Sequence, residues 1–355
     1  MNMSTFKSAD RIGSLKPYSP PARDARITLM LDNNEGAPVD QSVLDSIRSI
    51  SVDDMSRYPD ASCLERSIAD RFGVNASRVI VTNGGDDAID RVCRAILNVD
   101  DSLLTHTPGF VMIPRWAQLA GAQTKLIDWL DGQFPLNDML DSIDETTRLI
   151  ALVSPCNPTG SVIDSQSIIE IASKAQMVGA VVLLDQAYIE FAEDDPIEQV
   201  IGLPNVIVVR TFSKAMGLAG LRIGYAIGPQ RLIKWLRTVG GPYPVSVPSQ
   251  VIASAALANC DDRSEIIART TEHRALLIHT LKSMGILALE SQGNFVLARF
   301  GDARGAHESL LNHGVSVRRF RQGGDIESYL RITVPADPSQ LNQLIVALNT
   351  LGEYS

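Results

Sequence analysis

The chain has 355 residues, of which 45% are hydrophobic and 21% charged, and this composition is typical of a globular protein rather than a disordered or low-complexity one. With 32 basic and 41 acidic residues the formal net charge is −9, so we expect no nucleic-acid partner and no membrane-surface partner, since both favour basic clusters. The sequence has no apolar run near the roughly 20 residues of a membrane span, no secretory signal and only four widely spaced cysteines, so it predicts a cytoplasmic protein with free thiols and no metal site.

The first 30 residues contain several prolines and predict an irregular N-terminal arm. From about residue 40, segments that favour helix alternate with short apolar segments rich in β-branched residues. The predicted helices span residues 41–50, 63–72, 86–97, 109–120 and 165–178. The predicted strands span residues 78–82, 102–106, 148–153, 180–184 and 205–210. Apolar strands separated by helices are typical of an α/β fold with a mostly parallel sheet covered on both faces.

This alternation fades near residue 240. A long stretch that favours helix follows over 248–284, and predicted strands come after it at 294–300, 314–317 and 329–334. The pattern indicates a smaller α+β unit. We therefore predict three parts, which are an arm over 1–30, a large domain over 31–245 and a small C-terminal domain over 246–355.

Binding sites of open α/β sheets lie beyond the carboxyl ends of the strands, so the residues that follow each strand are candidates. The first predicted strand is followed by Asn83-Gly84-Gly85-Asp86, which is either an ordinary turn or a place where a phosphate approaches helix N–H groups. The strand over 148–153 is followed by a Pro- and Gly-containing loop over 154–160. That loop is either a rigid turn or a support that holds Asn157 in a site.

Asp185 ends the strand over 180–184, where a buried carboxylate is costly unless it is paired. It could cap a helix, or it could pair with a buried cation beside Tyr188.

Lys214 follows the strand over 205–210 among small and apolar residues. It is either a surface lysine with a buried stem or a buried, nucleophilic amine. The hydroxyls of Thr211 and Ser213, together with Arg222, could hold a phosphate near it. A phosphate site, an asparagine, a buried carboxylate and a lysine at one sheet edge match the needs of pyridoxal 5′-phosphate (PLP).

With these segments in place, the chain resembles the fold-type I PLP-dependent aminotransferases of class I/II over about residues 15–347, and within them most of all the histidinol-phosphate aminotransferases. The segments that carry the resemblance are RYPD (57–60), NGGDDAID (83–90), SPCNPTG (154–160), DQAYIEF (185–191), RTFSKAMGLAGLRIG (210–224) and SYLRIT (328–333). The resemblance implies a large domain with a mostly parallel sheet between helices and a smaller α+β C-terminal domain. It also implies PLP as cofactor and a homodimer with shared active sites.

The resemblance assigns roles residue by residue. Lys214 would hold the cofactor covalently and move the substrate proton, Asp185 would bind the pyridinium nitrogen, and Asn157 and Tyr188 would bind the ring oxygen. The phosphate would be bound by Gly85, Asp86, Thr211, Ser213, Arg222 and, from the neighbouring subunit, Tyr58, while Phe110 would stack on the ring. The residues on the substrate side would be Tyr18, Asn34, Arg318 and Arg331.

Three departures from the family pattern concern the substrate more than the cofactor. Cys156 and Gln186 stand where Asn and Glu are usual, and Gly36-Ala37 loosen the segment over 33–38. The expected reaction is amino transfer from histidinol phosphate to 2-oxoglutarate, giving imidazole acetol phosphate and glutamate. Alternatives are an aromatic or other amino-acid aminotransferase, a PLP-dependent decarboxylase, and a non-catalytic PLP-binding protein.

Overall fold

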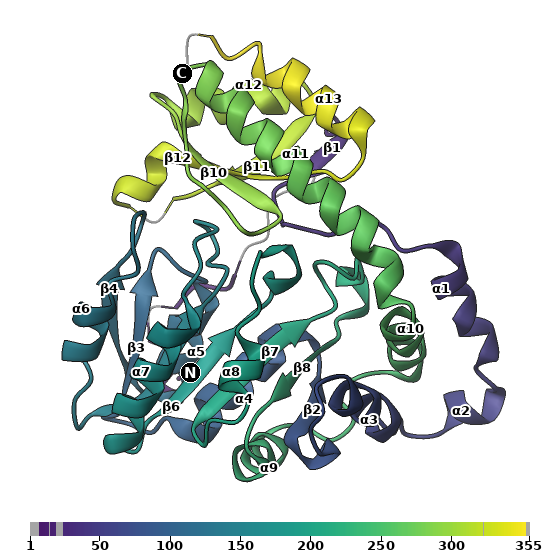
Figure 1. Cartoon of the computed structure of the whole chain (residues 1–355), viewed down its shortest axis with the longest axis vertical. Helices are drawn as coiled ribbons and strands as arrows, with labels where there is room; N and C mark the ends of the chain where they lie inside the picture. The colour runs from purple at the N-terminus through teal and green to yellow at the C-terminus, as the bar shows by residue number, and fades with distance from the viewer. Residues whose placement is uncertain (1–6, 14, 19–23, 322, 353–355) are drawn as a thin grey trace, which may run out of the picture.

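The computed structural model of the chain describes residues 7–13, 15–18, 24–321 and 323–352, and it contains two sheets, each with its own helices (Figure 1). The larger sheet has seven strands in the order β2-β8-β7-β6-β5-β3-β4. Its strands are β2 (Val79–Thr82), β3 (Ser102–Thr107), β4 (Gln123–Asp128), β5 (Thr147–Val153), β6 (Val181–Asp185), β7 (Val206–Thr211) and β8 (Gly224–Ile227). Strands that are neighbours in the part β7-β6-β5-β3-β4 of this order pair in parallel. Only β8 runs antiparallel to its neighbours, β2 and β7. The predicted α/β class with a mostly parallel sheet is therefore confirmed.

Helices cover both faces of this sheet, which explains why its strands are apolar without interruption. In β5, Leu149 and Ala151 pack towards the helices of one face, whereas Ile150 and Leu152 pack towards those of the other. The first set of helices is α4 (Gly84–Ile96), α5 (Met112–Ala120) and α9 (Gln230–Val239), and the second is α6 (Leu136–Asp141), α7 (Ser165–Met177) and α8 (Ile197–Val200). Because β5, β6 and β7 are neighbours that pair in parallel, their carboxyl ends meet at one edge of the sheet.

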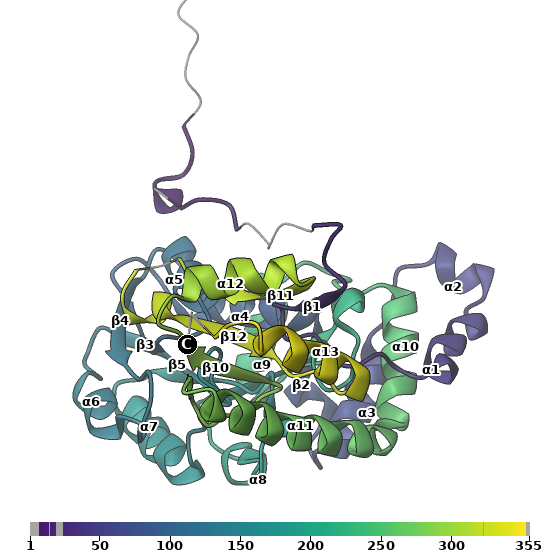
Figure 2. The ribbon, with the colours of Figure 1, turned by 90° about the horizontal axis from the view of Figure 1, so that it is seen from above.

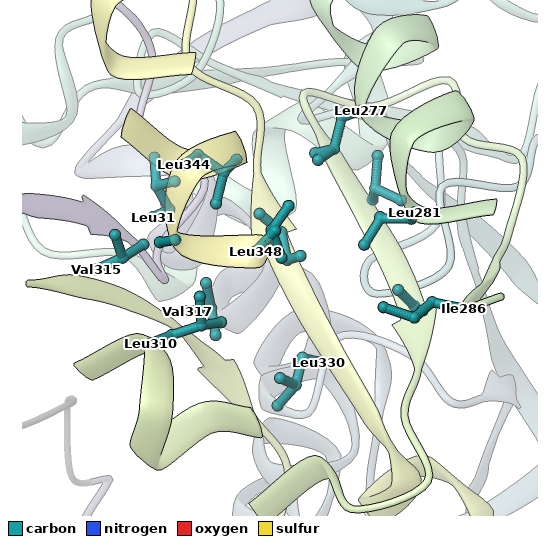
Figure 3. Close-up of a cluster of buried hydrophobic side chains, with 14 of the residues drawn as sticks. Leu31, Leu277, Leu281, Ile286, Leu310, Val315, Val317, Leu330, Leu344 and Leu348 are labelled. Atoms are coloured by element: carbon teal, nitrogen blue, oxygen red, sulfur yellow. The ribbon is translucent and has the colours of Figure 1, made fainter. Parts of the chain in front are cut away.

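The smaller sheet has the order β1-β11-β12-β10-β9. Its strands are β1 (Leu29–Leu31), β9 (Leu287–Ala288), β10 (Phe295–Arg299), β11 (Val315–Arg319) and β12 (Tyr329–Thr333). Three helices, α11 (Ser264–Ser283), α12 (Ala303–Asn312) and α13 (Pro338–Leu348), lie side by side over its outer face (Figure 2). Figure 3 shows how leucines of these helices meet alternate residues of the strands, such as Val315, Val317 and Leu330.

Two differences from the sequence-based expectations concern the small sheet and the helices near it. β1 lies at the end of the predicted arm yet pairs in parallel with β11, because a three-residue strand is too short to show a period in the sequence. The predicted helix over 248–284 is two helices, α10 (Val247–Ala258) and α11, separated by a 3₁₀ turn over Cys260–Arg263. Asn259, at the C-cap of α10, and the two aspartates after Cys260 favour a helix end rather than its continuation.

The remaining helices lie near the start of the chain. They are α1 (Gln41–Asp45), α2 (Val52–Ser56) and α3 (Ser62–Arg71). The helix α10 packs in the same apolar core as α3, through Ile252 and Ala253 against Leu64 and Ile68. The predicted domain limits of 31–245 and 246–355 stay predictions, and the predicted arm lies partly outside the described residues. Within the described part, no helix is both long enough and apolar enough to cross a membrane.

Candidate active site

A cavity of about 380 Å³ opens where the carboxyl ends of the large-sheet strands face the small sheet. Its size falls within the range of sites for small molecules and cofactors. Residues from both sheets line it. Every residue predicted for the site lines it except Tyr58 and Asn34. The loops after β2, β5, β6 and β7 therefore converge as the sequence indicated.

Lys214, in the turn after β7, places its amine in this cavity rather than on the surface. The side chain is half-buried, and its Nζ donates a hydrogen bond of 2.9 Å to the main-chain oxygen of Asn33. The same Nζ lies 5.4 Å from the centre of the Tyr188 ring. The amine therefore sits between the end of the large sheet and the segment that follows β1.

Asp185, the last residue of β6, is buried with 5% of its surface exposed. Its carboxylate accepts one hydrogen bond of 3.1 Å from the N–H of Ala187 but caps no α-helix. Burial raises the pKa of Asp185 to about 7, and the single N–H and the charge of Lys214 offset this only in part. A positively charged ring nitrogen at this carboxylate would supply the missing counter-charge.

The start of α4 and the turn after β7 form a cradle for an anion. The hydroxyls of Thr211 and Ser213 are 2.9 Å apart, and the Arg222 guanidinium lies 3.3 Å from Ser213 Oγ and 3.1 Å from Asp86 Oδ2. Gly84 has φ +78°, and a Cβ there would lie 2.6 Å from Arg222 Nη2. The guanidinium can therefore approach the free N–H groups of the helix start closely, as a phosphate site requires.

Asn157, Tyr188 and Phe110 line the same cavity as the lysine and the anion cradle. Asn157 Oδ1 accepts a hydrogen bond from Arg331, so the amide nitrogen of Asn157 is the atom that could donate to a ligand oxygen. Phe110 packs edge-to-face on Trp116, with ring centres 6.3 Å apart, and presents a flat apolar surface to the cavity.

Two arginines of the small sheet lie on the face that borders the cavity. In β12, Leu330 and Ile332 point into the small core, so the alternation of the strand turns Arg331 the other way. Arg318 of β11 is directly opposite Arg331 across the strand pair and also lines the cavity. Like charges in this position destabilise a sheet unless an anion lies between them.

Arg331 is buried and its partners are neutral. Its two terminal nitrogens donate to Asn157 Oδ1 and to the main-chain oxygen of Asp32, and its Nε is buried without a partner. Burial, with a smaller contribution from the nearby charge of Arg318, lowers the pKa of Arg331 to about 10. Tyr18 lies at the same part of the cavity. This part of the cavity therefore fits an anionic ligand group.

Two of the predicted residues do not line the cavity. Asn34 is fully buried and acts behind it, where its Nδ2 lies 3.2 Å from the hydroxyl oxygen of Tyr188 and its Oδ1 accepts from the Thr333 hydroxyl. Tyr58 is 81% exposed and stacks on Tyr243, with ring centres 4.6 Å apart.

Some contributors were not found from the sequence. The Asn33 carbonyl is a main-chain group, and no side-chain pattern marks it. Asn294, just before β10, donates to the main-chain oxygens of Asn34 and Glu35, and Arg263 donates to those of Ala37 and Pro38. These donors and their main-chain acceptors are far apart in the sequence. The contacts therefore exist only in the folded chain, and no sequence pattern marks them.

The residues present fit PLP. The buried Asp185 carboxylate lacks a cation, the cradle around Arg222 suits a phosphate, and Lys214 supplies an amine in the same cavity. The unpaired Nε of Arg331 adds a place for a substrate anion.

Comparison with known proteins agrees with this geometry. The model of the family "Aminotransferase class I and II" matches residues 30–348. A histidinol-phosphate aminotransferase of Carboxydothermus hydrogenoformans is 33% identical over 361 aligned positions, covering 98% of each chain. One from a Thermoanaerobacter strain is 36% identical over 284 positions, covering 78% of this chain and 79% of the other.

Solved structures show the same fold. The crystal structure of histidinol-phosphate aminotransferase from Sinorhizobium meliloti in complex with pyridoxal 5′-phosphate has a TM-score of 0.87, is 25% identical, and covers 99% of this chain and 98% of its own. Aspartate aminotransferase from Thermus thermophilus with maleate has a TM-score of 0.82 at 21% identity, covering 98% of this chain and 100% of its own, and it supports the fold alone.

Proposed function

The chain belongs to the aminotransferase class I and II family, and from this premise we propose that it uses PLP to transfer the amino group of histidinol phosphate to 2-oxoglutarate. The products would be imidazole acetol phosphate and glutamate. The observation that carries the proposal is the pair of arginines, Arg318 and Arg331, that lines the same cavity as Lys214. The curated relatives that are named for this reaction support it.

The cofactor-binding residues act mainly by charge and position. When bound, PLP supplies an electron sink for the substrate carbon next to nitrogen. Asp185 holds the ring nitrogen in its protonated form, because a buried carboxylate is stabilised by an adjacent cation. Asn157 and Tyr188 orient the ring through its oxygen, and Phe110 stacks on it. The residues that hold the phosphate are Gly85, Asp86, Thr211, Ser213 and Arg222.

Lys214 has two tasks in this proposal. At rest it binds the cofactor covalently through its amine. With its amine free, Lys214 would remove the proton from the substrate Cα as a general base. The Asn33 carbonyl, which accepts from Lys214 Nζ in this structure, offers the released amine a fixed place beside the substrate.

The substrate anion would bind between Arg318 and Arg331, where Tyr18 also lines the cavity. A guanidinium binds a phosphate or a carboxylate with two parallel hydrogen bonds, so the same pocket can accept the phosphate of one substrate and the distal carboxylate of 2-oxoglutarate in turn. Alternating use of one anion pocket is what a two-substrate amino transfer needs.

The experiment is a set of half-reactions with histidinol phosphate, glutamate and phenylalanine, followed by conversion of bound PLP to its pyridoxamine form. We expect wild type to prefer histidinol phosphate, which carries a phosphate, and glutamate, which carries a second carboxylate, to phenylalanine, whose one acid group is its α-carboxylate. Arg331→Ala should weaken kcat/KM for histidinol phosphate and glutamate about tenfold to a hundredfold, as loss of a charge-assisted hydrogen bond does. A preference for phenylalanine would replace the proposal by an aromatic aminotransferase, and release of carbon dioxide would replace it by a decarboxylase.

We also propose that the active form is a homodimer with shared sites. Tyr58 supports this, because its side chain lies outside the cavity of its own subunit and is exposed on the surface, where a second copy of the chain could pack. Its stacking partner Tyr243 is exposed as well and extends the same aromatic surface.

A further inference from the structure

We propose that Arg263 is a positioning residue that holds the segment over 32–38 against the Lys214 turn and so places the Asn33 carbonyl at the lysine amine. The inference rests on the proposed role of Lys214 as general base. Arg263 lies in the 3₁₀ turn just before α11, about 50 residues after Lys214 in sequence, and its side chain is buried.

The segment over 32–38 is held by side chains rather than by regular structure. Residues 34–40 belong to no helix or strand. Side chains from elsewhere in the fold donate to five carbonyl oxygens of the segment over 32–38: Arg331 to Asp32 O, Asn294 to Asn34 O and Glu35 O, and Arg263 to Ala37 O and Pro38 O. Within this segment, the Asn33 carbonyl is the one that accepts from Lys214.

Arg263 joins this segment to the lysine turn directly. Its Nε donates 3.0 Å to the main-chain oxygen of Ala215, the residue after Lys214, while its two terminal nitrogens donate 2.8 Å to Ala37 O and Pro38 O. One planar, rigid group therefore fixes the distance between two loops. We call these three hydrogen bonds of Arg263 the clamp. Hydrogen bonds from a charged donor are stronger than neutral ones, so the clamp resists separation of the two loops.

The two loops are in close contact where Arg263 joins them. A Cβ at Gly36 would lie 1.7 Å from the main-chain oxygen of Lys214, and a Cβ at Gly217 would lie 2.1 Å from that of Ala37. This contact explains why a glycine stands at position 36, where the sequence departs from the family pattern: the backbone there touches the backbone of Lys214 and leaves no room for a side chain.

The helix α11 offers a matched control. Arg274 is also buried, and its Nη1 donates to two main-chain oxygens, those of Phe191 and Gly293. Neither oxygen belongs to the lysine turn or to the segment over 32–38. Loss of Arg274 should therefore cost stability without freeing the amine of Lys214.

The test is acetylation of the full chain freed of cofactor by acetic anhydride, with the label on Lys214 measured by peptide mass spectrometry relative to the exposed Lys234. We expect Arg263→Met to raise the relative labelling of Lys214 about threefold or more, because the amine loses a fixed acceptor. Arg274→Met should leave the labelling as in wild type. Arg263→Lys, which keeps the charge but can reach fewer carbonyls, should give an intermediate value and guards against misfolding of the methionine variant.

In the cofactor-loaded protein, Arg263→Met should lower kcat about tenfold with KM within about twofold, since the clamp acts on the lysine and not on the substrate. Equal labelling of Lys214 in Arg263→Met and Arg274→Met would overturn the inference and leave Arg263 with a structural role only. The labelling needs neither cofactor nor substrate, so its failure is distinct from failure of the proposed reaction.

Discussion

At the scale of single residues, the site depends on charges that are buried before any ligand is bound. Asp185 lies at a strand end without a salt bridge, and Arg331 is buried among neutral partners. Both would be costly in a protein that bound nothing. The two charges therefore mark where a cation and an anion of the ligands belong.

The first prediction concerns the stability of the cofactor-free protein and Asp185. The folded carboxyl has a pKa of about 7, above the roughly 4 of an unfolded chain, so the folded state binds the proton more tightly. Its contribution to stability is complete below about pH 4 and is lost as the pH rises to about 7. We expect the Tm of wild type to fall between about pH 5 and about pH 8 relative to that of Asp185→Asn.

Thermal scans of the two proteins at both pH values check this prediction. Saturation with PLP should abolish the fall in the Tm of wild type between the two pH values, because a cationic ring nitrogen stabilises the carboxylate of Asp185. The same pH dependence in both cofactor-free proteins would show that Asp185 does not carry the effect. Asp185→Asn should also lose most of its turnover while remaining folded.

At the scale of elements, the approach of α4 to Arg222 depends on Gly84. An alanine there meets two obstacles, which are a φ of +78° and a Cβ 2.6 Å from Arg222 Nη2. We expect Gly84→Ala to lose about 1 kcal/mol or more of stability and to weaken PLP binding about tenfold, because the guanidinium must leave the cradle.

Gly179 provides the control for this prediction. It has a φ of +73°, but nothing lies within 4 Å of a Cβ built there. Gly179→Ala should therefore show the backbone cost without any change in PLP affinity. Equal PLP titrations for the two alanine variants would contradict the proposed cradle.

The elements also show where sequence reasoning succeeds and where it ends. The strands that carry the site, such as β5 and β7, could be predicted because burial on both faces leaves an uninterrupted apolar pattern. β4 escaped detection because it is an edge strand with polar positions, and β8 because its glycine start and four-residue length resemble a loop. Pairing of β1 with β11 joins residues far apart in sequence and leaves no local signal.

The same limit applies to the site. Lys214, Asp185 and Arg222 could be predicted because each belongs to a distinctive sequence segment that starts at the end of an apolar strand. The clamp by Arg263 could not, because its partners are main-chain oxygens brought together only by the fold.

At the scale of the whole molecule, we expect a dimer whose sites take Tyr58 from the partner. Tyr58→Ala and Lys214→Ala should each be nearly inactive alone. A mixture that exchanges subunits should recover about a quarter of wild-type activity, because some mixed dimers then contain one site with both residues intact. Sedimentation at assay concentration provides the second measurement, and an active monomer would contradict shared sites.

Borohydride reduction shows directly whether Lys214 holds PLP in this cavity, as proposed above. The protein is reduced with borohydride in the presence of PLP, digested, and its labelled peptide is identified by mass spectrometry. We expect the cofactor mass on Lys214 alone, together with loss of the yellow colour of the cofactor-loaded protein and of its activity. A label on any other lysine, or no covalent label at all, would contradict it.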